Sequence, residues 1–422
     1  MKAIILAAGK GERLEPITHT RPKPLIPIMN KPLLLHTLDA LREINVRDVV
    51  IVVNYLKEKI VEKVNEYSRK HGIHIKVIDQ GKPLGTGHAV KIVERYLNEP
   101  FLLIYGDLFF SKKVLSKLVN TEPPVMSLVH VDNPKDYGVV VTSGEYVLDI
   151  VEKPEHEVPS STINAGIYYL TPQVFQALDK VGKSPRGEYE LTDALKLMIK
   201  EGVKIRYIVL KDGEWFEIGK PWDLLSVHER ILRELNYTRI EGEVEDYVKI
   251  KGPVIIEEGA LIRSGSYIIG PAYIGRNTVI GPNSYIRPYT VIGEDTKIGN
   301  AVEIKNSIIM EHVRIQHLSY VGDSIICEHV NFGAGTITAN LRFDEREVKV
   351  TVKGKRISSK RNKLGAIVGG HVKTGINVSL MPGVKIGAYS WISPGAIVDR
   401  DVPRSTFLRV KTEYYYDRLP TS

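Results

Sequence analysis

The chain has 422 residues, more than one hydrophobic core usually organises, and its length therefore predicts two or three domains. Apolar residues make up 43% and charged residues 26%, a balance that is typical of folded proteins and excludes a disordered chain. The net charge of +8 is moderate, and because the sequence has neither an arginine-rich arm nor a basic and aromatic pattern, we expect no nucleic acid partner.

Cysteine usage and hydropathy indicate the compartment. Cys327 is the only cysteine, so an intrachain disulfide is impossible and a reducing compartment, the cytoplasm, is expected. No stretch approaches the roughly 18 apolar residues that span a bilayer, so we expect no membrane partner. The apolar start of the chain is too short for a signal peptide, and because Gly9 and Gly11 follow at once, it is interpreted as a first β-strand.

Short β-rich runs alternate with helical patterns over the first half of the chain, which indicates an α/β domain with a Rossmann-like, mostly parallel sheet. We expect this domain at residues 1–225 and a linker helix at residues 226–246. The runs that predict strands are Ala3–Leu6, Val49–Val53, Ile75–Ile78 and Phe101–Tyr105. The helix-period runs are Leu33–Ile44, Ile60–Tyr67 and Trp222–Leu235.

A six-residue period begins near residue 248. Neither a helix nor a flat strand repeats every six residues, but a coil with six residues on each face does, since each face then turns one aliphatic side chain inward. The isoleucines that carry the period stand at 250, 256, 262, 268, 274, 280, 286, 292, 298 and 304. We expect this coiled domain at residues 247–410.

The period slips after Ile304 and resumes in two later sets, one beginning at Val372 and one at Ile386. Between the first and the later coils, Leu341 to Lys363 is rich in lysine and arginine and is interpreted as an extruded loop. A tyrosine-rich tail is expected at residues 411–422.

The glycine loop at residues 9–13 lies between a predicted strand and helix, where backbone N–H groups can hold phosphate. By itself it is equally consistent with a simple turn, because Leu14 replaces the third glycine of a dinucleotide fingerprint and no P-loop lysine follows. Arg13 and Lys23 add two cations beside the loop. The whole stretch from Leu6 through Pro24 resembles the signature of the sugar-phosphate nucleotidylyltransferases.

That resemblance implies that UTP or dTTP and a sugar 1-phosphate react with release of pyrophosphate. Arg13 and Lys23 are then catalytic cations for the phosphates. The segment that begins at Gln80 resembles the part of the family that reads the base, although a polar loop is the plain alternative. The residues implied to bind the nucleotide are Leu6, Ala8, Gly9, Gly11, Gln80, Gly85 and Thr86.

Metal and sugar residues follow from the same resemblance. Asp107, at the end of an apolar strand, is implied to bind Mg²⁺, although a strand-ending aspartate without a ligand is the alternative. Glu217 matches the second metal ligand, where the family has aspartate or asparagine, so the ligation is expected to be looser or shifted. The residues implied to bind the sugar phosphate are Gly138, Glu152, Lys153 and Asn164.

The six-residue period resembles the left-handed parallel β-helix of hexapeptide-repeat acyltransferases, which implies a homotrimer. A purely structural β-helix is the alternative. The run Gln316–Asp323, with Val330–Thr336, resembles the acetyltransferase half of the bacterial bifunctional enzymes that make UDP-N-acetylglucosamine. This implies that His317 is the general base that takes a proton from an amino sugar as it attacks acetyl-CoA.

The second resemblance also implies binding residues. Arg287, Lys305, Tyr320, Asn331, Asn340 and Lys363 would hold the amino sugar 1-phosphate, although Lys349 or Lys353 of the longer basic loop could replace Lys363. Gly333, Ala334 and Pro394 would contact acetyl-CoA, and Thr374–Gly375 stands where a coenzyme-contacting serine is expected.

The sequence thus predicts a bifunctional enzyme that N-acetylates glucosamine 1-phosphate or galactosamine 1-phosphate. Its other site transfers a nucleotidyl group to N-acetylglucosamine 1-phosphate or glucose 1-phosphate. The alternatives are a monofunctional UDP- or dTDP-glucose pyrophosphorylase with a structural β-helix, and a regulatory subunit without chemistry. The pair of cations with Asp107 speaks against a regulatory subunit, because a scaffold needs no such arrangement.

Overall fold

The computed structural model describes residues 1–154 and 159–419, so the last three residues of the predicted tail lie outside it. Contacts divide the chain into two compact units. The first comprises Met1–Gly11 and Arg21–Gly219, and the second comprises Glu12–Thr20 and the chain from Lys220 onward. The predicted domain boundaries at residues 225 and 247 stay a prediction.

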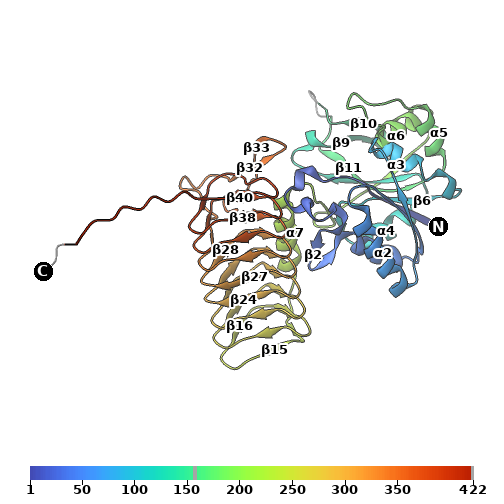
Figure 1. Cartoon of the computed structure of the whole chain (residues 1–422). Coiled ribbons are helices and arrows are strands. Elements are labelled where there is room, and N and C mark those ends of the chain that lie inside the picture. The colour runs from blue at the N-terminus through green and yellow to red at the C-terminus, as the bar shows by residue number, and fades with distance from the viewer. Residues whose placement is uncertain (155–158, 420–422) are drawn as a thin grey trace. The chain divides into compact units, whose positions relative to one another are not determined.

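The first unit is built on one sheet whose described strands have the order β5-β4-β1-β6-β11-β8-β12-β10-β9 (Figure 1). Their bounds are β1 (Lys2–Ala7), β4 (Asp48–Val53), β5 (His74–Asp79), β6 (Phe101–Tyr105), β8 (Val125–His130), β9 (Gly138–Ser143), β10 (Tyr146–Glu152), β11 (Thr162–Leu170) and β12 (Arg206–Val209). Two short pairs flank the sheet: β2 (Pro27–Ile28) with β3 (Lys31–Pro32), and β7 (Leu108–Phe110) with β13 (Trp215–Glu217).

Helices cover both faces of this sheet, as the side chains of β1 show. Ala3 and Ile5 pack with one apolar cluster and Ile4 packs with another. The first cluster takes in α1 (Leu33–Glu43), α2 (Lys57–His71) and α4 (Lys113–Val119), and the second takes in α3 (Thr86–Lys91), α5 (Gln173–Lys180) and α6 (Leu191–Lys200). A strand that is buried on both faces is continuously apolar, which is why the sequence pattern marked it clearly.

The four strands expected from the sequence are confirmed as β1, β4, β5 and β6, and they are parallel. The other half of the sheet is mixed. Strand β11 runs antiparallel to β6 and to β8, and β10 runs antiparallel to β9 and β12. The expectation of a mostly parallel sheet therefore describes the half that carries the glycine loop, whereas hairpin connections shape the other half.

The second unit opens with α7 (Pro221–Arg233) and continues as a parallel β-helix with three faces (Figure 1). The first face has β14 (Arg239–Ile240), β17 (Val254–Ile256), β20 (Ala272–Ile274), β23 (Thr290–Ile292), β26 (Ile308–Ile309), β29 (Ile325–Ile326), β34 (Ile367–Val368) and β37 (Lys385–Ile386). The second has β15 (Glu243–Val244), β18 (Leu261–Ile262), β21 (Val279–Ile280), β24 (Lys297–Asn300), β27 (Arg314–His317), β30 (Asn331–Phe332), β35 (Lys373–Thr374), β38 (Trp391–Ile392) and β40 (Phe407–Leu408). The third has β16 (Lys249–Lys251), β19 (Tyr267–Ile269), β22 (Tyr285–Ile286), β25 (Glu303–Lys305), β28 (Tyr320–Gly322), β31 (Ile337–Thr338), β36 (Ser379–Leu380) and β39 (Ile397–Val398).

The coil-to-coil register explains both the period and its slip. Ile256 pairs with Ile274 and Ile274 with Ile292, eighteen residues apart each time, so three faces of six residues form one coil. Ile292 then pairs with Ile309, only seventeen residues on. The corner that loses a residue follows β25, at Asn306, because the inward side chains on either side of it are Ile304 and Ile309. The next coil is shortened at the same corner.

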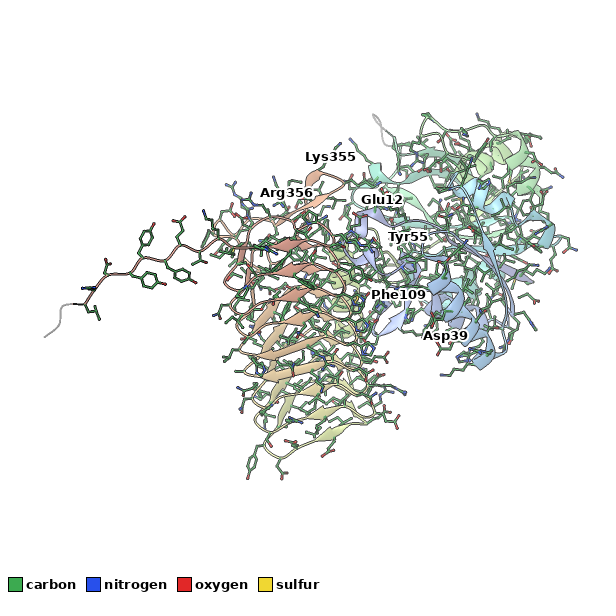
Figure 2. All side chains as sticks on the ribbon, in the orientation of Figure 1. Glu12, Asp39, Tyr55, Phe109, Lys355 and Arg356 are labelled. Carbon is green, nitrogen blue, oxygen red and sulfur yellow. The ribbon has the colours of Figure 1, made fainter. Side chains whose placement is uncertain are left out.

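The basic segment is not an extruded loop, as the sequence suggested, but carries an antiparallel hairpin of β32 (Lys349–Val352) and β33 (Lys355–Ser358). Val348 and Val350 are fully buried, and a side chain at Gly383 of the β-helix would touch Val348. Lys355 and Arg356, by contrast, are exposed at its tip (Figure 2). Apolar residues at alternate positions therefore pack the hairpin against the β-helix, while its charged side chains face solvent.

The remaining features concern the surface. Within the described ranges, no helix is long and apolar enough to cross a membrane. The tail through residue 419 has no strand or helix, and Tyr414, Tyr415 and Tyr416 are exposed.

One corner of the β-helix carries a column of stacked rings. His312, His329, His371 and Tyr389 come from successive coils, with ring centroids 4.7 Å apart. All four have left-handed backbones, with φ between 56° and 62°. Burial lowers the pKa of His329, and the charges of His371 and His312 lower it further.

We expect this column to make stability depend on pH. The carboxylates of Glu328 and Glu311 oppose the lowering of the His329 pKa but do not cancel it. Since the folded pKa of His329 lies below the unfolded one, its stabilising contribution is present above the unfolded pKa and is lost as pH falls through the folded pKa. His329→Asn keeps a residue type that tolerates a left-handed backbone. We expect the variant to reduce the drop in melting temperature between about pH 7.5 and about pH 5.5 by about 2 °C.

Scanning calorimetry at the two pH values measures this effect. His74→Asn, which changes an exposed histidine on edge strand β5, is the control and should keep the pH dependence of the unaltered protein. An identical drop in the melting temperature of His329→Asn would show that the column does not respond to pH.

Candidate functional site

An ion pair marks the carboxyl ends of β1 and β6. The Nζ of Lys23 donates to Oδ2 of Asp107 at 2.6 Å, and the lysine side chain is only 11% exposed. Gly106 brings the two strand ends together, because its N–H donates to the carbonyl of Leu6 at 2.9 Å and a Cβ there would lie 2.7 Å from that oxygen. The predicted phosphate lysine and the predicted metal ligand are therefore in direct contact.

Glu217 lies beside Asp107. In the pairing of β13 with β7, Glu217 is opposite Leu108, and the N–H of Ile218 donates to the carbonyl of Asp107 at 3.0 Å. Carboxylates offer the oxygen ligands that a hard cation prefers, so Asp107, in the turn before β7, and Glu217, on β13, fit a role in holding Mg²⁺. In the parts of the chain that the structure describes, no group of three or more His, Cys, Asp or Glu could hold a metal ion.

The glycine loop follows the carboxyl end of β1. Leu6 belongs to β1, Ala8 is buried, and a side chain at Gly9 would meet no described atom within 4 Å. Gly11 has a φ of +70°, which favours glycine. Arg13, the last residue of this loop, lies in the segment Glu12–Thr20 that is part of the second compact unit.

The segment predicted to read the base is anchored by hydrogen bonds and by the close packing of Gly85. Gln80 is buried, and its Nε2 donates to the carbonyl of Gly85 at 3.0 Å. Gly85 has a φ of +104°, and a Cβ there would lie 2.5 Å from the carbonyl of Tyr189. Thr86 begins α3, and its hydroxyl accepts from the N–H of Leu191 at 3.0 Å. Gln80, Gly85 and Thr86 thus form one anchored unit.

The predicted sugar residues come together on β9, β10 and β11. Gly138 is paired with Glu152, and a Cβ at Gly138 would lie 2.9 Å from the Oε2 of Glu152 and 3.8 Å from Asn164. Lys153 follows Glu152 with a φ of 44°. Asn164 donates to the Oη of Tyr168 at 2.5 Å and accepts from the N–H of Gly166 at 3.0 Å.

The sequence interpretation missed the residues that orient Glu152. Arg186 donates to Oε1 of Glu152 at 3.2 Å, and the hydroxyl of Thr192 donates to Oε2 at 3.3 Å. Tyr168 and Tyr105 are joined at 3.4 Å behind Asn164, and burial raises the pKa of both phenols. Arg186 and Thr192 contact Glu152 from 34 and 40 residues away, so no local motif marks them.

A second group of predicted residues lies on the third face of the β-helix. Arg287 donates to Glu303 at 2.8 Å, and Glu303 is paired with Tyr320 on the next coil. Asn340 donates to the Oη of Tyr320 at 3.2 Å. Burial raises the pKa of Tyr320, and the charges of Asp323 and Glu303 raise it further. Arg287, Tyr320 and Asn340 are thus brought into one polar network.

Two lysines border this network. Lys305, on β25, donates to Asp323 at 2.7 Å. Lys363 forms an isolated antiparallel β-bridge with Leu341 at the base of the basic segment. The N–H of Leu364 donates to the carbonyl of Asn340 at 2.9 Å, so Lys363 lies beside Asn340. This placement favours Lys363 over Lys353, whose Nζ pairs with Glu12 at 2.9 Å.

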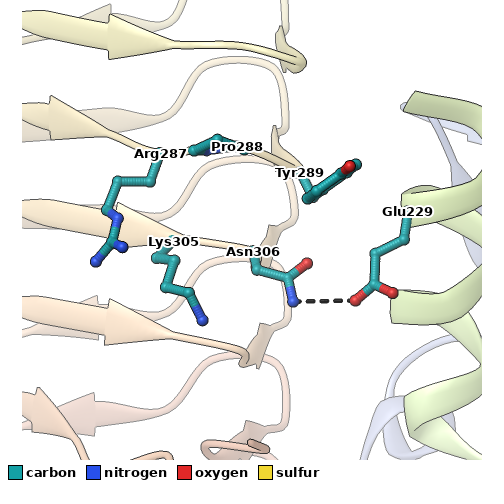
Figure 3. A pocket seen from close by; sticks show the side chains of 6 residues that line it. All are labelled: Glu229, Arg287, Pro288, Tyr289, Lys305 and Asn306. Atoms are coloured by element: carbon teal, nitrogen blue, oxygen red, sulfur yellow. Dashed lines mark hydrogen bonds between the residues drawn. The ribbon is translucent and has the colours of Figure 1, made fainter. Parts of the chain in front are cut away.

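A pocket of about 360 Å³ opens at the shortened corner (Figure 3). Arg287 and Lys305 contribute cations from adjacent coils, and Asn306 donates to Glu229 of α7 at 3.0 Å. Glu229 also pairs with Arg361 of the basic segment. The residues that line the pocket are Glu229, Arg287, Pro288, Tyr289, Lys305 and Asn306. Such a cationic pocket suits a phosphate.

His317 lies on the second face, at the end of β27, where the chain turns toward Tyr320 on the third face. It is exposed, and its carbonyl accepts from the N–H of Gly335 at 3.3 Å and from the hydroxyl of Ser319 at 2.7 Å. The neighbouring coil therefore passes His317 at Ala334 and Gly335.

The residues predicted to contact acetyl-CoA lie on consecutive coils beside His317. A Cβ at Gly333 would lie 2.3 Å from the carbonyl of Gly375, and one at Gly375 would lie 2.5 Å from the N of Pro394. Thr374 is engaged within the fold, because its hydroxyl accepts from the N–H of Gly333 at 3.0 Å. Asn331 is paired with Arg314 and Lys373 on the second face, so it does not join the network on the third face.

Family models match both units of the chain. A nucleotidyl transferase model matches residues 2–234, and a model named GMPPB C-terminal domain matches residues 268–364. The chain is 29% identical to a solved structure of a putative glucose-1-phosphate thymidylyltransferase from Bacillus anthracis, with a TM-score of 0.50. That match covers 57% of this chain and 98% of the other.

Relatives match along nearly the whole chain. A bifunctional sugar-1-phosphate nucleotidylyltransferase/acetyltransferase from Sulfurisphaera tokodaii is 53% identical over 97% of this chain and 100% of its own length. A bifunctional protein GlmU from Methanocaldococcus jannaschii is 47% identical over 99% of this chain and 100% of its own length. The chain therefore belongs to the family of bifunctional sugar-1-phosphate nucleotidylyltransferase/acetyltransferases.

Proposed function

We propose that the first unit transfers a uridylyl or thymidylyl group from UTP or dTTP to N-acetylglucosamine 1-phosphate or glucose 1-phosphate, with release of pyrophosphate. The single observation that carries this proposal is the contact between Lys23 and Asp107 beside the glycine loop. A lysine that neutralises phosphate and a carboxylate that holds a cation are the two charges this reaction needs at one place.

In this mechanism an oxygen of the sugar phosphate attacks the α-phosphorus of the nucleotide, and pyrophosphate leaves from the opposite side. The backbone N–H groups of the glycine loop and the guanidinium of Arg13 bind the triphosphate. Lys23 donates to the α-phosphate, where negative charge accumulates in the transition state. Asp107 and Glu217 would hold Mg²⁺, which would supply charge neutralisation at the phosphates.

Substrate selection falls to two groups of residues. Gln80, held by Gly85, presents its amide to the edge of a pyrimidine base. Glu152 accepts hydrogen bonds from sugar hydroxyls, and Asn164 accepts from them or donates to them. Lys153 pairs with the sugar phosphate. Gly138 leaves room beside Glu152 for the ring of the sugar. A Cβ at this position would lie 2.9 Å from the Oε2 of Glu152 and would fill that space.

The second unit acetylates glucosamine 1-phosphate, or galactosamine 1-phosphate, on its amine. His317 accepts a proton from the amine as the nitrogen attacks the thioester carbon of acetyl-CoA, and the C–S bond breaks to release CoA as a thiolate that takes up a proton. Arg287, Lys305 and Lys363 bind the phosphate, while Tyr320, Asn331 and Asn340 orient the sugar. Gly333, Ala334 and Pro394 contact acetyl-CoA.

A homotrimer formed through the β-helix is part of this proposal. Asn331 and His317 lie on the second face, whereas Lys305 lies on the third and Asn340 follows β31 of the third. A neighbouring copy of the chain would complete a site whose residues are spread over two faces in this way.

A matrix of substrates tests the proposal. Purified protein with Mg²⁺ is incubated with each of five nucleoside triphosphates and with glucose 1-phosphate or N-acetylglucosamine 1-phosphate, and pyrophosphate release is measured. We expect release with UTP and dTTP above the other three nucleotides. Release of free CoA from acetyl-CoA is measured in parallel, with glucosamine 1-phosphate or galactosamine 1-phosphate as the acceptor. Absence of CoA release with both amino sugar phosphates would instead favour a structural β-helix.

A further inference from the structure

Asp323 is a buried carboxylate at the shortened corner of the β-helix. Its side chain is only 3% exposed, and its backbone is left-handed, with a φ of 49°. It occupies the corner after β28, one coil beyond Asn306, where the chain crosses from Val321 to Ile326 with one residue fewer than in the first coils. The phase slip in the sequence therefore marks the corner at which the carboxylate of Asp323 is buried in the wall of the β-helix.

Three donors converge on this carboxylate. Its Oδ2 accepts from the Nζ of Lys305 at 2.7 Å and from the Nδ2 of Asn340 at 2.5 Å. Its Oδ1 accepts from the Nδ2 of Asn306 at 2.8 Å. Among the side chains of this size only an ionised aspartate accepts at both oxygens and also balances the charge of the lysine.

Two of these donors are in the set assigned above to the amino sugar 1-phosphate. We propose that Asp323 is a positioning residue for acetyl transfer, which holds Lys305 and Asn340 in place for that substrate. This inference rests on the proposed second site. Asp323 itself does not touch the reacting atoms.

The hydrogen bonds show what this positioning achieves. Lys305 has three N–H donors, and one bond to Asp323 leaves two for a phosphate. Both N–H groups of Asn340 are committed, one to Asp323 and one to the Oη of Tyr320, so the orientation of its amide oxygen is fixed. Misplacing such groups by about 1 Å lowers a reaction rate about 100-fold.

Asp323→Asn isolates this role. Asparagine has the same shape and tolerates a left-handed backbone, but it offers one acceptor oxygen and one NH₂ donor. At least one of the three donors then faces another donor and must move. We expect the KM for the amino sugar 1-phosphate to rise about 10- to 100-fold, while nucleotidyl transfer stays unchanged.

A matched control is available on another corner. Asp295 also has a left-handed backbone, with a φ of 54°, and accepts from Asn277 at 3.3 Å, but it lies between β23 and β24, at the corner of the first and second faces, whereas Lys305 is on the third. Asp295→Asn makes the same chemical change, and we expect it to leave the KM unaltered. Melting temperatures of both variants report any general loss of stability.

A double variant separates positioning from a merely structural role. If Asp323 acts through Lys305, the loss in kcat/KM caused by Asp323→Asn is largely absent when Lys305 is already alanine. Full addition of the two losses, or an unchanged KM in Asp323→Asn, would overturn the inference. If Lys305→Ala and Asn340→Ala both acetylate normally, the site assignment itself is wrong, which is a different outcome.

Discussion

Lys23→Met is expected to lower the kcat of nucleotidyl transfer by about 100- to 1,000-fold, the loss that follows removal of one well-placed donor to a transition-state oxygen. Methionine has a similar length and no charge, so the variant removes the donor while filling most of the space. Asp107 keeps a 27% exposed side chain, so water can solvate the carboxylate that loses its partner. Pyrophosphate release at saturating substrate measures the effect.

The control for Lys23→Met is a lysine that makes an ion pair of similar length away from the site. Lys180 pairs with Glu201 at 2.7 Å, and both side chains are largely exposed. Exposed pairs contribute little to stability, so Lys180→Met should leave both activities unchanged. A Lys23→Met protein with normal kcat would show that the lysine is only a structural partner of Asp107.

His317→Asn is expected to lower the kcat of acetyl transfer by about 100- to 10,000-fold, which is the contribution of a positioned general base. His317 is exposed at the end of β27, so the substitution removes little packing. Its role is proton transfer and not phosphate binding, and the KM for glucosamine 1-phosphate should therefore stay near its original value. Release of free CoA measures both constants.

His312→Asn provides the control for this variant. His312 is another exposed histidine of the β-helix, in the ring column on a different corner. Acetyl transfer should continue at its normal rate in that protein. Retention of acetyl transfer by His317→Asn would remove the proposed base.

The predictability of the fold differs between elements for physical reasons. Strand β1 buries both of its faces and is therefore a continuous apolar run, and the inward isoleucines of the β-helix repeat at the spacing of its faces. The antiparallel pairing of β11 with β6 joins residues more than sixty positions apart, and no local pattern selects that partner. In the basic segment, the alternation of Val348, Val350 and Val352 indicates a strand, but the surrounding charges favoured a loop interpretation.

The candidate sites, too, could be predicted from the sequence only in part. Motif order indicated Lys23 and Asp107, and the structure places them in contact. The contacts of Arg186 and Thr192 with Glu152 depend on where β10 and α6 meet, so the sequence could not predict them. Asp323 stood inside a motif that we recognised, yet nothing in the motif indicates that three donors converge on it.

The central claim is that one chain carries two independent active sites. The most direct test measures pyrophosphate release and CoA release in single preparations of the unaltered protein, Lys23→Met and His317→Asn. We predict that Lys23→Met loses only pyrophosphate release and that His317→Asn loses only CoA release. Loss of both activities in either variant, with its melting temperature unchanged, would contradict the account.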